Sequence, residues 1–199
     1  MDARLAAWAR AVKARRAKAG LPFVPPLWLF TDPVRLADPR EAVARLPRGL
    51  AGVVLRGDGA PGRAALARDV ARICRARRLM LSVAGDWRLA AAHHAGVHAR
   101  GGHRPAGMTR GLRLLTASVH DRADAVRARR GGVAVAFISP VFPTRSHPGA
   151  RPLGPARWAV LANWAGQGRA AALGGIDTSR IRRLPLRLCR AAGAIGALR

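Results

Sequence analysis

The 199-residue chain has no tyrosine, two cysteines, ten acidic residues and no apolar run long enough to span a membrane. A spanning helix needs roughly 20 apolar residues, so we expect no membrane association. Cys74 and Cys189 are too few for a disulfide scaffold or a zinc knuckle, which favours reduced thiols and a cytoplasmic location. The length nevertheless allows one domain with a substantial core.

The scarcity of acids leaves a formal net charge of +26, from 36 lysines and arginines against 10 acids. Such a charge suggests a nucleic-acid partner. However, the arginines are spread along the chain, and the few Phe and Trp residues do not alternate with them as a base-stacking platform requires. Nucleic-acid binding therefore stays open but is not favoured, and the charge predicts a salt-dependent attraction of phosphorylated ligands.

The first segment has the pattern of an appended helix. Leu5, Trp8 and Val12 recur among basic residues between positions 2 and 19, and Gly20 follows. Prolines interrupt the next apolar stretch, so a secretory signal is a poor match. We therefore divide the chain into residues 1–26, an amphipathic helix with a proline-rich lead-in, and residues 27–199, one larger domain.

From residue 27 onward, strand-like and helix-like segments alternate. Apolar runs predict eight strands, at 27–31, 52–55, 79–83, around 97, and at 114–119, 133–138, 170–173 and 188–198. Helical spacing and capping residues predict helices over 63–78, 87–94, 121–130, 155–164 and 177–184. This alternation predicts an α/β fold, a single (β/α)8 TIM barrel with an N-terminal appended helix, and an open doubly wound sheet is the alternative.

Short motifs at the ends of these strands resemble the thiamine phosphate synthase and thiazole tautomerase family over residues 27 to about 198. The matching segments are 29–32 (LFTD), 54–56 (VLR), 89–90 (LA), 96–98 (GVH), 117–120 (ASVH), 140–144 (PVFPT), 172–176 (ALGGI) and 194–197 (AIGA). The resemblance implies a (β/α)8 barrel that binds a small phosphorylated heterocycle, a thiazole phosphate. Synthases join it to a pyrimidine pyrophosphate with Mg²⁺, whereas tautomerases move a proton on the ring without a metal.

The chain departs from the synthase pattern where that resemblance places the pyrophosphate and metal ligands. The synthases' Gln, Arg and Lys at the second strand correspond here to Val54, Arg56 and Asp58. Their Asn-Asp pair after the third strand corresponds to residues 84–85, Ala-Gly, with Asp86 next to it. Because Mg²⁺ prefers oxygen ligands, Asp86 would bind it only in a rebuilt site. We therefore favour no cofactor and metal-independent proton transfer, as in the tautomerases.

The resemblance also supplies the candidate site residues. It implies that His120 is the catalytic acid and base, a role that suits imidazole because it titrates near neutral pH. His98 is expected to be structural. Glycine lets the backbone approach a phosphate closely, as in the loops after strands seven and eight of many barrels. The expected substrate-binding residues are Arg56, Ser118, Thr144 and His147, and the expected phosphate-binding residues are Gly174, Gly175, Ile195 and Gly196.

Two other functions remain open. One is a divergent synthase that uses Mg²⁺ to join thiazole phosphate to pyrimidine pyrophosphate. The other belongs to a different class, a non-catalytic phosphate-ester-binding protein or a basic RNA-associated protein. The sequence does not indicate the oligomeric state.

Overall fold

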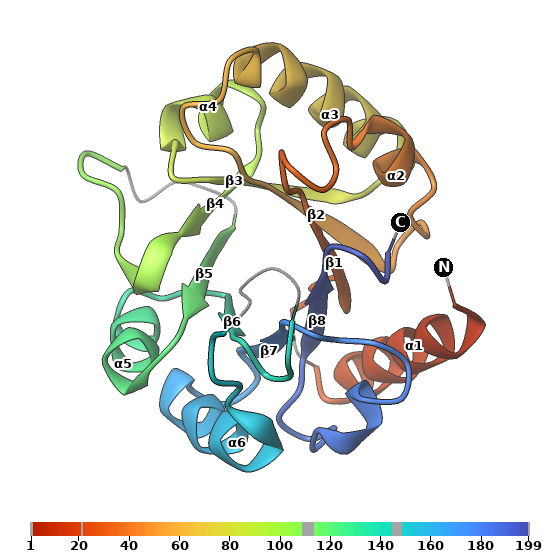
Figure 1. Ribbon diagram of the computed structural model, residues 1–199, viewed down its shortest axis with the longest axis vertical. Helices are drawn as coiled ribbons and strands as arrows, with labels where there is room; N and C mark the ends of the chain where they lie inside the picture. The colour runs from red at the N-terminus through yellow and green to blue at the C-terminus, as the bar shows by residue number, and fades with distance from the viewer. Residues whose placement is uncertain (1, 21, 109–113, 145–148, 199) are drawn as a thin grey trace.

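A closed barrel of eight parallel strands forms the centre of the computed structural model, which describes residues 2–20, 22–108, 114–144 and 149–198 (Figure 1). Each strand pairs with its neighbours in chain order, and the last strand pairs with the first. The predicted (β/α)8 barrel is therefore confirmed over the open sheet. The strands are β1 (Leu27–Phe30), β2 (Ala51–Leu55), β3 (Met80–Ala84), β4 (Gly96–Ala99), β5 (Leu115–Val119), β6 (Val135–Ile138), β7 (Ala170–Leu173) and β8 (Ala191–Ala194).

Helices cover the outside of the barrel unevenly. They are α1 (Ala3–Lys18), α2 (Arg40–Ala44), α3 (Arg63–Arg77), α4 (Trp87–Ala92), α5 (Arg122–Arg130) and α6 (Gly154–Ala165), with single 3₁₀ turns η1 (Arg100–Gly102) after β4 and η2 (Ile181–Arg183) after β7. No helix in the described parts of the chain is both long and apolar enough to cross a membrane.

The helix predicted over 177–184 is wrong, because only the turn η2 forms there. The Asp177 carboxylate accepts hydrogen bonds from the backbone N–H groups of Ser179 and Arg180, at 3.0 and 2.8 Å. Such local side-chain bonds satisfy the backbone without a continuing helix. Pro185 follows one residue after the predicted end, which helps to limit the helical conformation to one turn.

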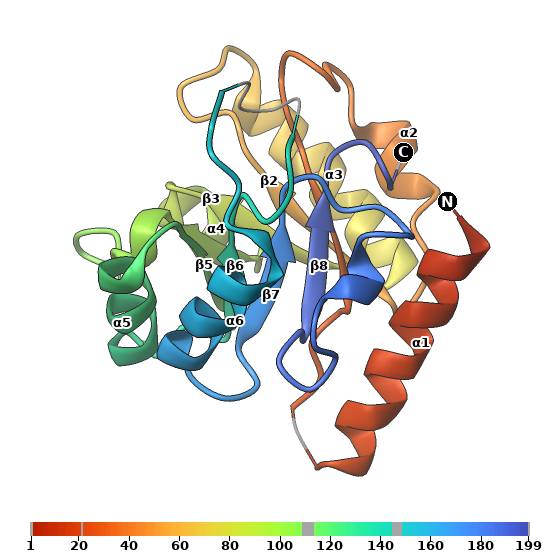
Figure 2. The same cartoon turned by 60° about the horizontal axis from the view of Figure 1, so that its bottom comes forward.

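The appended helix α1 packs against the barrel beside the segment that precedes β8 (Figure 2). Its Leu5, Trp8 and Val12 side chains are buried in the main apolar cluster. Asp2 caps the helix by accepting from the N–H of Arg4 at 2.7 Å, and Thr178 donates to the other oxygen of the same carboxylate at 2.6 Å. The predicted N-terminal helix is therefore confirmed. It covers the part of the barrel next to η2, where the chain forms only a single helical turn.

Large aromatic side chains fill the interior of the barrel opposite glycines. Trp28 and Phe30 point inward from β1 and meet Phe137 of β6 edge-on, with ring centroids 5.7 and 4.8 Å away. A Cβ atom at Gly52 would lie 2.8 Å from the Trp28 ring, and one at Gly193 would lie 2.7 Å from the Phe30 ring. Glycine on the neighbouring strands thus makes room for the aromatic rings, a packing of large against small that fills the barrel.

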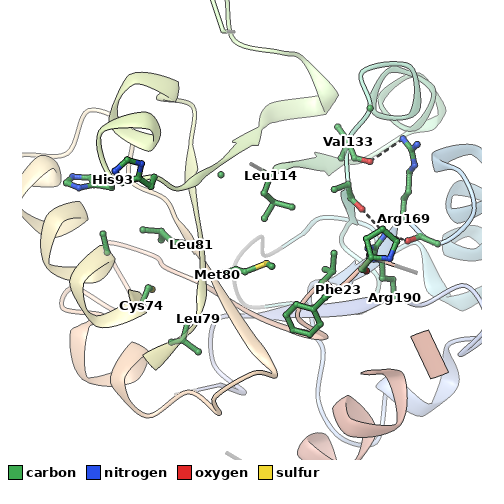
Figure 3. Close-up of a pocket in the computed structure, with 18 of the residues that line it drawn as sticks. Phe23, Cys74, Leu79, Met80, Leu81, His93, Leu114, Val133, Arg169 and Arg190 are labelled. Carbon is green, nitrogen blue, oxygen red and sulfur yellow. Dashed lines mark hydrogen bonds between the residues drawn. The ribbon is translucent and has the colours of Figure 1, made fainter. Parts of the chain in front are cut away.

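The amino-terminal end of the barrel contains a cavity of about 720 Å³ (Figure 3). Arg169 and Arg190 lie on one wall, and apolar side chains such as Met80 and Leu114 line much of the rest. The two guanidinium groups donate to backbone carbonyls, Arg169 to Val133 at 3.3 Å and Arg190 to Ala134 at 3.2 Å. These arginines therefore hold the chain that leads into β6, and those expected site residues that the structure describes lie toward the opposite end of the barrel.

Candidate functional site

The carboxyl-terminal ends of the strands surround a cavity of about 600 Å³. Barrel enzymes build their active sites at this end, and the volume suits a small-molecule ligand. Its lining combines residues that follow β1, β2, β5, β6, β7 and β8: Arg35, Arg56, His120, Ser139, Pro140, Pro143, Thr144, Ala150, Leu173, Gly174, Gly175, Ile176, Asp177, Arg180, Ala194, Ile195, Gly196 and Ala197.

Most of the residues expected from the sequence meet in this cavity. They are Arg56, His120, Thr144, Gly174, Gly175, Ile195 and Gly196. Ser118 is not among the lining residues, and its hydroxyl accepts a hydrogen bond from the N–H of Gly101 at 3.1 Å, joining η1 to β5. His147 lies outside the described residues. Asp86 also lies away from the cavity lining, because it caps α4 by accepting from the N–H of Leu89 at 2.9 Å.

The imidazole of His120 is held in one orientation immediately after β5. Its Nδ1 lies 3.0 Å from the backbone carbonyl oxygen of Ser139. A carbonyl oxygen only accepts hydrogen bonds, so Nδ1 carries the proton, and in the neutral ring Nε2 is the nitrogen with the free lone pair. The backbone N–H of His120 donates to the Asp124 carboxylate at 3.0 Å, which ties His120 to the first turn of α5. The arrangement is that of an oriented acid–base group on the wall of a cavity.

The glycines after β7 allow two loops to approach closely. Gly174 and Gly175 have φ angles of +91° and +64°, which residues with side chains rarely adopt. A Cβ atom at Gly175 would lie 2.5 Å from the carbonyl oxygen of Pro143. In the described residues, the N–H groups of Gly175 and Gly196 have no hydrogen-bond acceptor. Two backbone donors at neighbouring loops therefore remain for an anionic ligand.

Replacing Gly175 with alanine is expected to destabilise the fold by about 2–4 kcal/mol, from backbone strain and a clash with the Pro143 carbonyl. The free energy of unfolding from urea titrations measures the effect. Gly196→Ala is the matched control, because its φ is not left-handed and a Cβ there would meet no atom within 4 Å. Equal losses for the two variants would contradict this role of Gly175.

Three arginines contribute positive charge to the cavity: Arg35, Arg56 and Arg180. Arg56 lies 3.4 Å from the Asp32 carboxylate, and Arg180 donates to the carbonyl of Gly175 at 3.1 Å. Only Arg56 was expected from the sequence. Arg35 and Arg180 follow strand ends within a few residues, but a chain so rich in arginine offers no signal that separates them from the rest.

His98 is buried in the interior of the barrel and is not among the residues that line the cavity. Its Nδ1 is 2.9 Å from the Thr116 hydroxyl, and its ring packs edge-on to Phe30. Burial, together with the positive charges of Arg56 and Arg100, lowers the pKa of His98 to about 3. The ring is therefore neutral at physiological pH and forms part of the packed interior, in line with the structural role expected for it.

The carboxylates at this end of the barrel do not fit a magnesium site. Asp32 accepts from the N–H of Val34 and contacts Arg56, whereas Asp58 contacts Arg63 and Arg100. Asp86 is occupied by its helix cap. Among the described residues, no three histidines, cysteines or acids come together as a metal-binding group. Mg²⁺ requires accessible oxygen ligands, and these oxygens already bind cationic or backbone donors.

Comparisons with known proteins show the family by sequence and the fold by structure. The model of the family described as thiamine monophosphate synthase matches residues 30–197. No curated protein matches the chain by sequence. A thiamine phosphate pyrophosphorylase from Pyrococcus furiosus superposes with a TM-score of 0.69 and 23% identity, covering 86% of this chain and 85% of its own.

Two further solved structures share the fold. A thiamine phosphate pyrophosphorylase from Bacteroides thetaiotaomicron has a TM-score of 0.58 and 14% identity, covering 87% of this chain and 84% of its own. A structure described as native KDPGal has a TM-score of 0.54 and 12% identity over the same shares. At such identities the structural likeness concerns the barrel alone.

Proposed function

Since the chain belongs to the thiamine monophosphate synthase family, whose model matches residues 30–197, we propose that its barrel binds a thiazole phosphate and transfers a proton on the thiazole ring without a metal. The observation that carries this proposal is the oriented imidazole of His120. Its Nδ1 is bound to the Ser139 carbonyl, and the ring lines the same cavity as the glycine loops. One cavity thus combines an acid–base group with backbone donors for a phosphate.

The phosphate group binds between the loops after β7 and β8. The N–H groups of Gly175 and Gly196 supply neutral donors, and Arg180, which also lines the cavity, supplies positive charge nearby. Thr144 and Arg56 line the same cavity, and in this proposal they contact the heterocycle and its carboxylate. Because much of the attraction is electrostatic, the affinity for the phosphate ester falls as the salt concentration rises.

Proton transfer needs only one base when the proton returns to the same ring. Nε2 of His120 takes a proton from one position of the thiazole, and the resulting imidazolium returns it at another position. The Ser139 carbonyl accepts from Nδ1–H in both states, which stabilises the imidazolium and keeps the ring oriented. No proton, electron or leaving group is gained or lost overall.

The synthase reaction is the alternative that the family name supports. In the synthases that the chain resembles, Mg²⁺ assists the departing pyrophosphate, and concentrated negative charge of this kind requires strong positive stabilisation. The carboxylates that face this end of the barrel are already engaged by arginines or by backbone N–H groups. This donor set favours the tautomerase reaction over the synthase reaction.

Calorimetric titration with thiazole carboxylate phosphate, followed by assays of both reactions, tests the proposal. We expect binding and tautomerisation that are equal in Mg²⁺ and in a chelator. Synthase turnover abolished by the chelator would replace the proposal by its alternative. Binding without either reaction would indicate a non-catalytic phosphate-ester-binding protein. Salt-dependent RNA binding without phosphate-ester binding would contradict both the tautomerase and the synthase function.

A further inference from the structure

Asp58, in the loop after β2, is held between two arginines from different parts of the barrel. Its carboxylate lies 3.0 Å from the Arg63 guanidinium at the start of α3 and 2.5 Å from the Arg100 guanidinium just after β4. The Arg63 side chain is only 11% exposed and also donates to the backbone carbonyl of Ala84. We call Asp58, Arg63 and Arg100 the arginine clamp.

The arginine clamp closes over the end of β3. Gly85 adopts a φ of +70°, and a Cβ atom there would lie 2.5 Å from Oδ2 of Asp58. The carboxylate of Asp58 therefore fills the space into which any side chain at position 85 would project. Arg63 binds Asp58 and the Ala84 carbonyl together, so a buried cation occupies the end of this strand.

We propose that the arginine clamp takes the place of a divalent cation at the carboxyl-terminal end of the barrel and makes ligand binding independent of metal ions. The inference builds on the proposed function, because it concerns the same end of the barrel. A metal ion that bound Asp58 would have to displace both guanidinium groups, or else lie within a few ångströms of two fixed positive charges. Either course disfavours metal binding.

The clamp also defines a second region of positive charge. Two guanidinium groups and one carboxylate leave a net charge of +1, and the Arg100 side chain is 77% exposed. An exposed guanidinium beside a fixed carboxylate still has donors for a second anion. The chemistry that fits this region is a further anionic group, at a distance from the phosphate loops.

Titration with Mn²⁺, followed by electron paramagnetic resonance, tests the clamp with no substrate present. For the full-length wild-type protein we expect the spectrum of free Mn²⁺. In the double variant Arg63→Ala, Arg100→Ala, the Asp58 carboxylate is released beside Gly85, one position before Asp86. We then expect Mn²⁺ binding with a dissociation constant of about 10⁻³ M or lower. Adding Asp58→Asn to the double variant should abolish that binding. Arg45→Ala, which releases only the exposed Glu41, is the matched control and should leave Mn²⁺ free.

Two results would overturn the inference. One is stoichiometric Mn²⁺ binding by the wild-type protein that Asp58→Asn removes, because Asp58 would then be a metal ligand. The other is a folded double variant that still leaves Mn²⁺ free. Circular dichroism and thermal melting verify folding, and Arg100→Ala alone, a change at an exposed side chain, replaces the double variant if that variant unfolds. Since the readout needs no substrate, it is independent of whether the tautomerase assay succeeds.

Discussion

Replacing His120 with alanine is expected to lower kcat for thiazole proton transfer by about 10²- to 10⁴-fold, the usual contribution of a positioned acid–base group. The dissociation constant of the phosphate ester should change little, since the proposed phosphate donors are on the loops at Gly175 and Gly196. Nuclear magnetic resonance of the two tautomers gives kcat, and calorimetry gives the affinity. The expected pattern is a loss confined to kcat, because the imidazole acts mainly on the transition state.

His93→Ala is the matched control for this experiment. The same residue type is removed there from the wall of the cavity at the amino-terminal end of the barrel (Figure 3). That variant should keep the wild-type kcat. A His120→Ala enzyme with unchanged turnover would remove His120 from the mechanism, and a parallel loss in both variants would point to damage of the fold rather than of the chemistry.

The barrel follows from the sequence because its strands are buried on both faces. Short apolar runs separated by helical segments mark such strands, and the runs at 52–55 and 170–173 agree with β2 and β7 within one residue. The segment at 177–184 differs from its predicted helix because the Asp177 carboxylate accepts hydrogen bonds from the backbone N–H groups of Ser179 and Arg180. Local hydrogen bonds of this kind depend on the backbone conformation, so the spacing of apolar residues does not reveal them.

The candidate site is predictable only where it lies directly at strand ends. His120 and the glycine pair at 174–175 follow β5 and β7 immediately, so the fold alone brings them to one rim. Asp58 and Arg100, by contrast, are 42 positions apart in the chain, and their contact depends on loop conformation. The sequence likewise offers no sign that the Ser118 hydroxyl is occupied by Gly101. The position of a motif at a strand end thus predicts where a side chain lies. Its hydrogen-bond or ion-pair partner can be identified only from the tertiary structure.

Acid is expected to destabilise the protein through His98, a histidine the barrel keeps neutral. Burial, with the charges of Arg56 and Arg100, lowers the pKa of His98 from 6.5 to about 3 in the folded state. Between these values the unfolded chain binds a proton that the folded chain does not, so the stability decreases as the pH falls. The contribution is fully present above pH 6.5 and declines by about 1.4 kcal/mol per pH unit below it, until the pH nears the folded-state pKa.

The variant His98→Phe isolates this effect. Phenylalanine keeps an aromatic ring beside Phe30 and does not titrate, and Thr116 retains the Ser82 hydroxyl 3.2 Å away as a partner. Urea unfolding at pH 7 and pH 4.5 should show a smaller acid-induced loss in the variant than in the wild type, by about 2–3 kcal/mol. Titrating carboxylates are common to both proteins and cancel in the difference. His103→Gln, at an exposed histidine, should keep the wild-type pH dependence. Parallel pH curves for wild type and His98→Phe would show that His98 is protonated as readily in the folded barrel as in the unfolded chain.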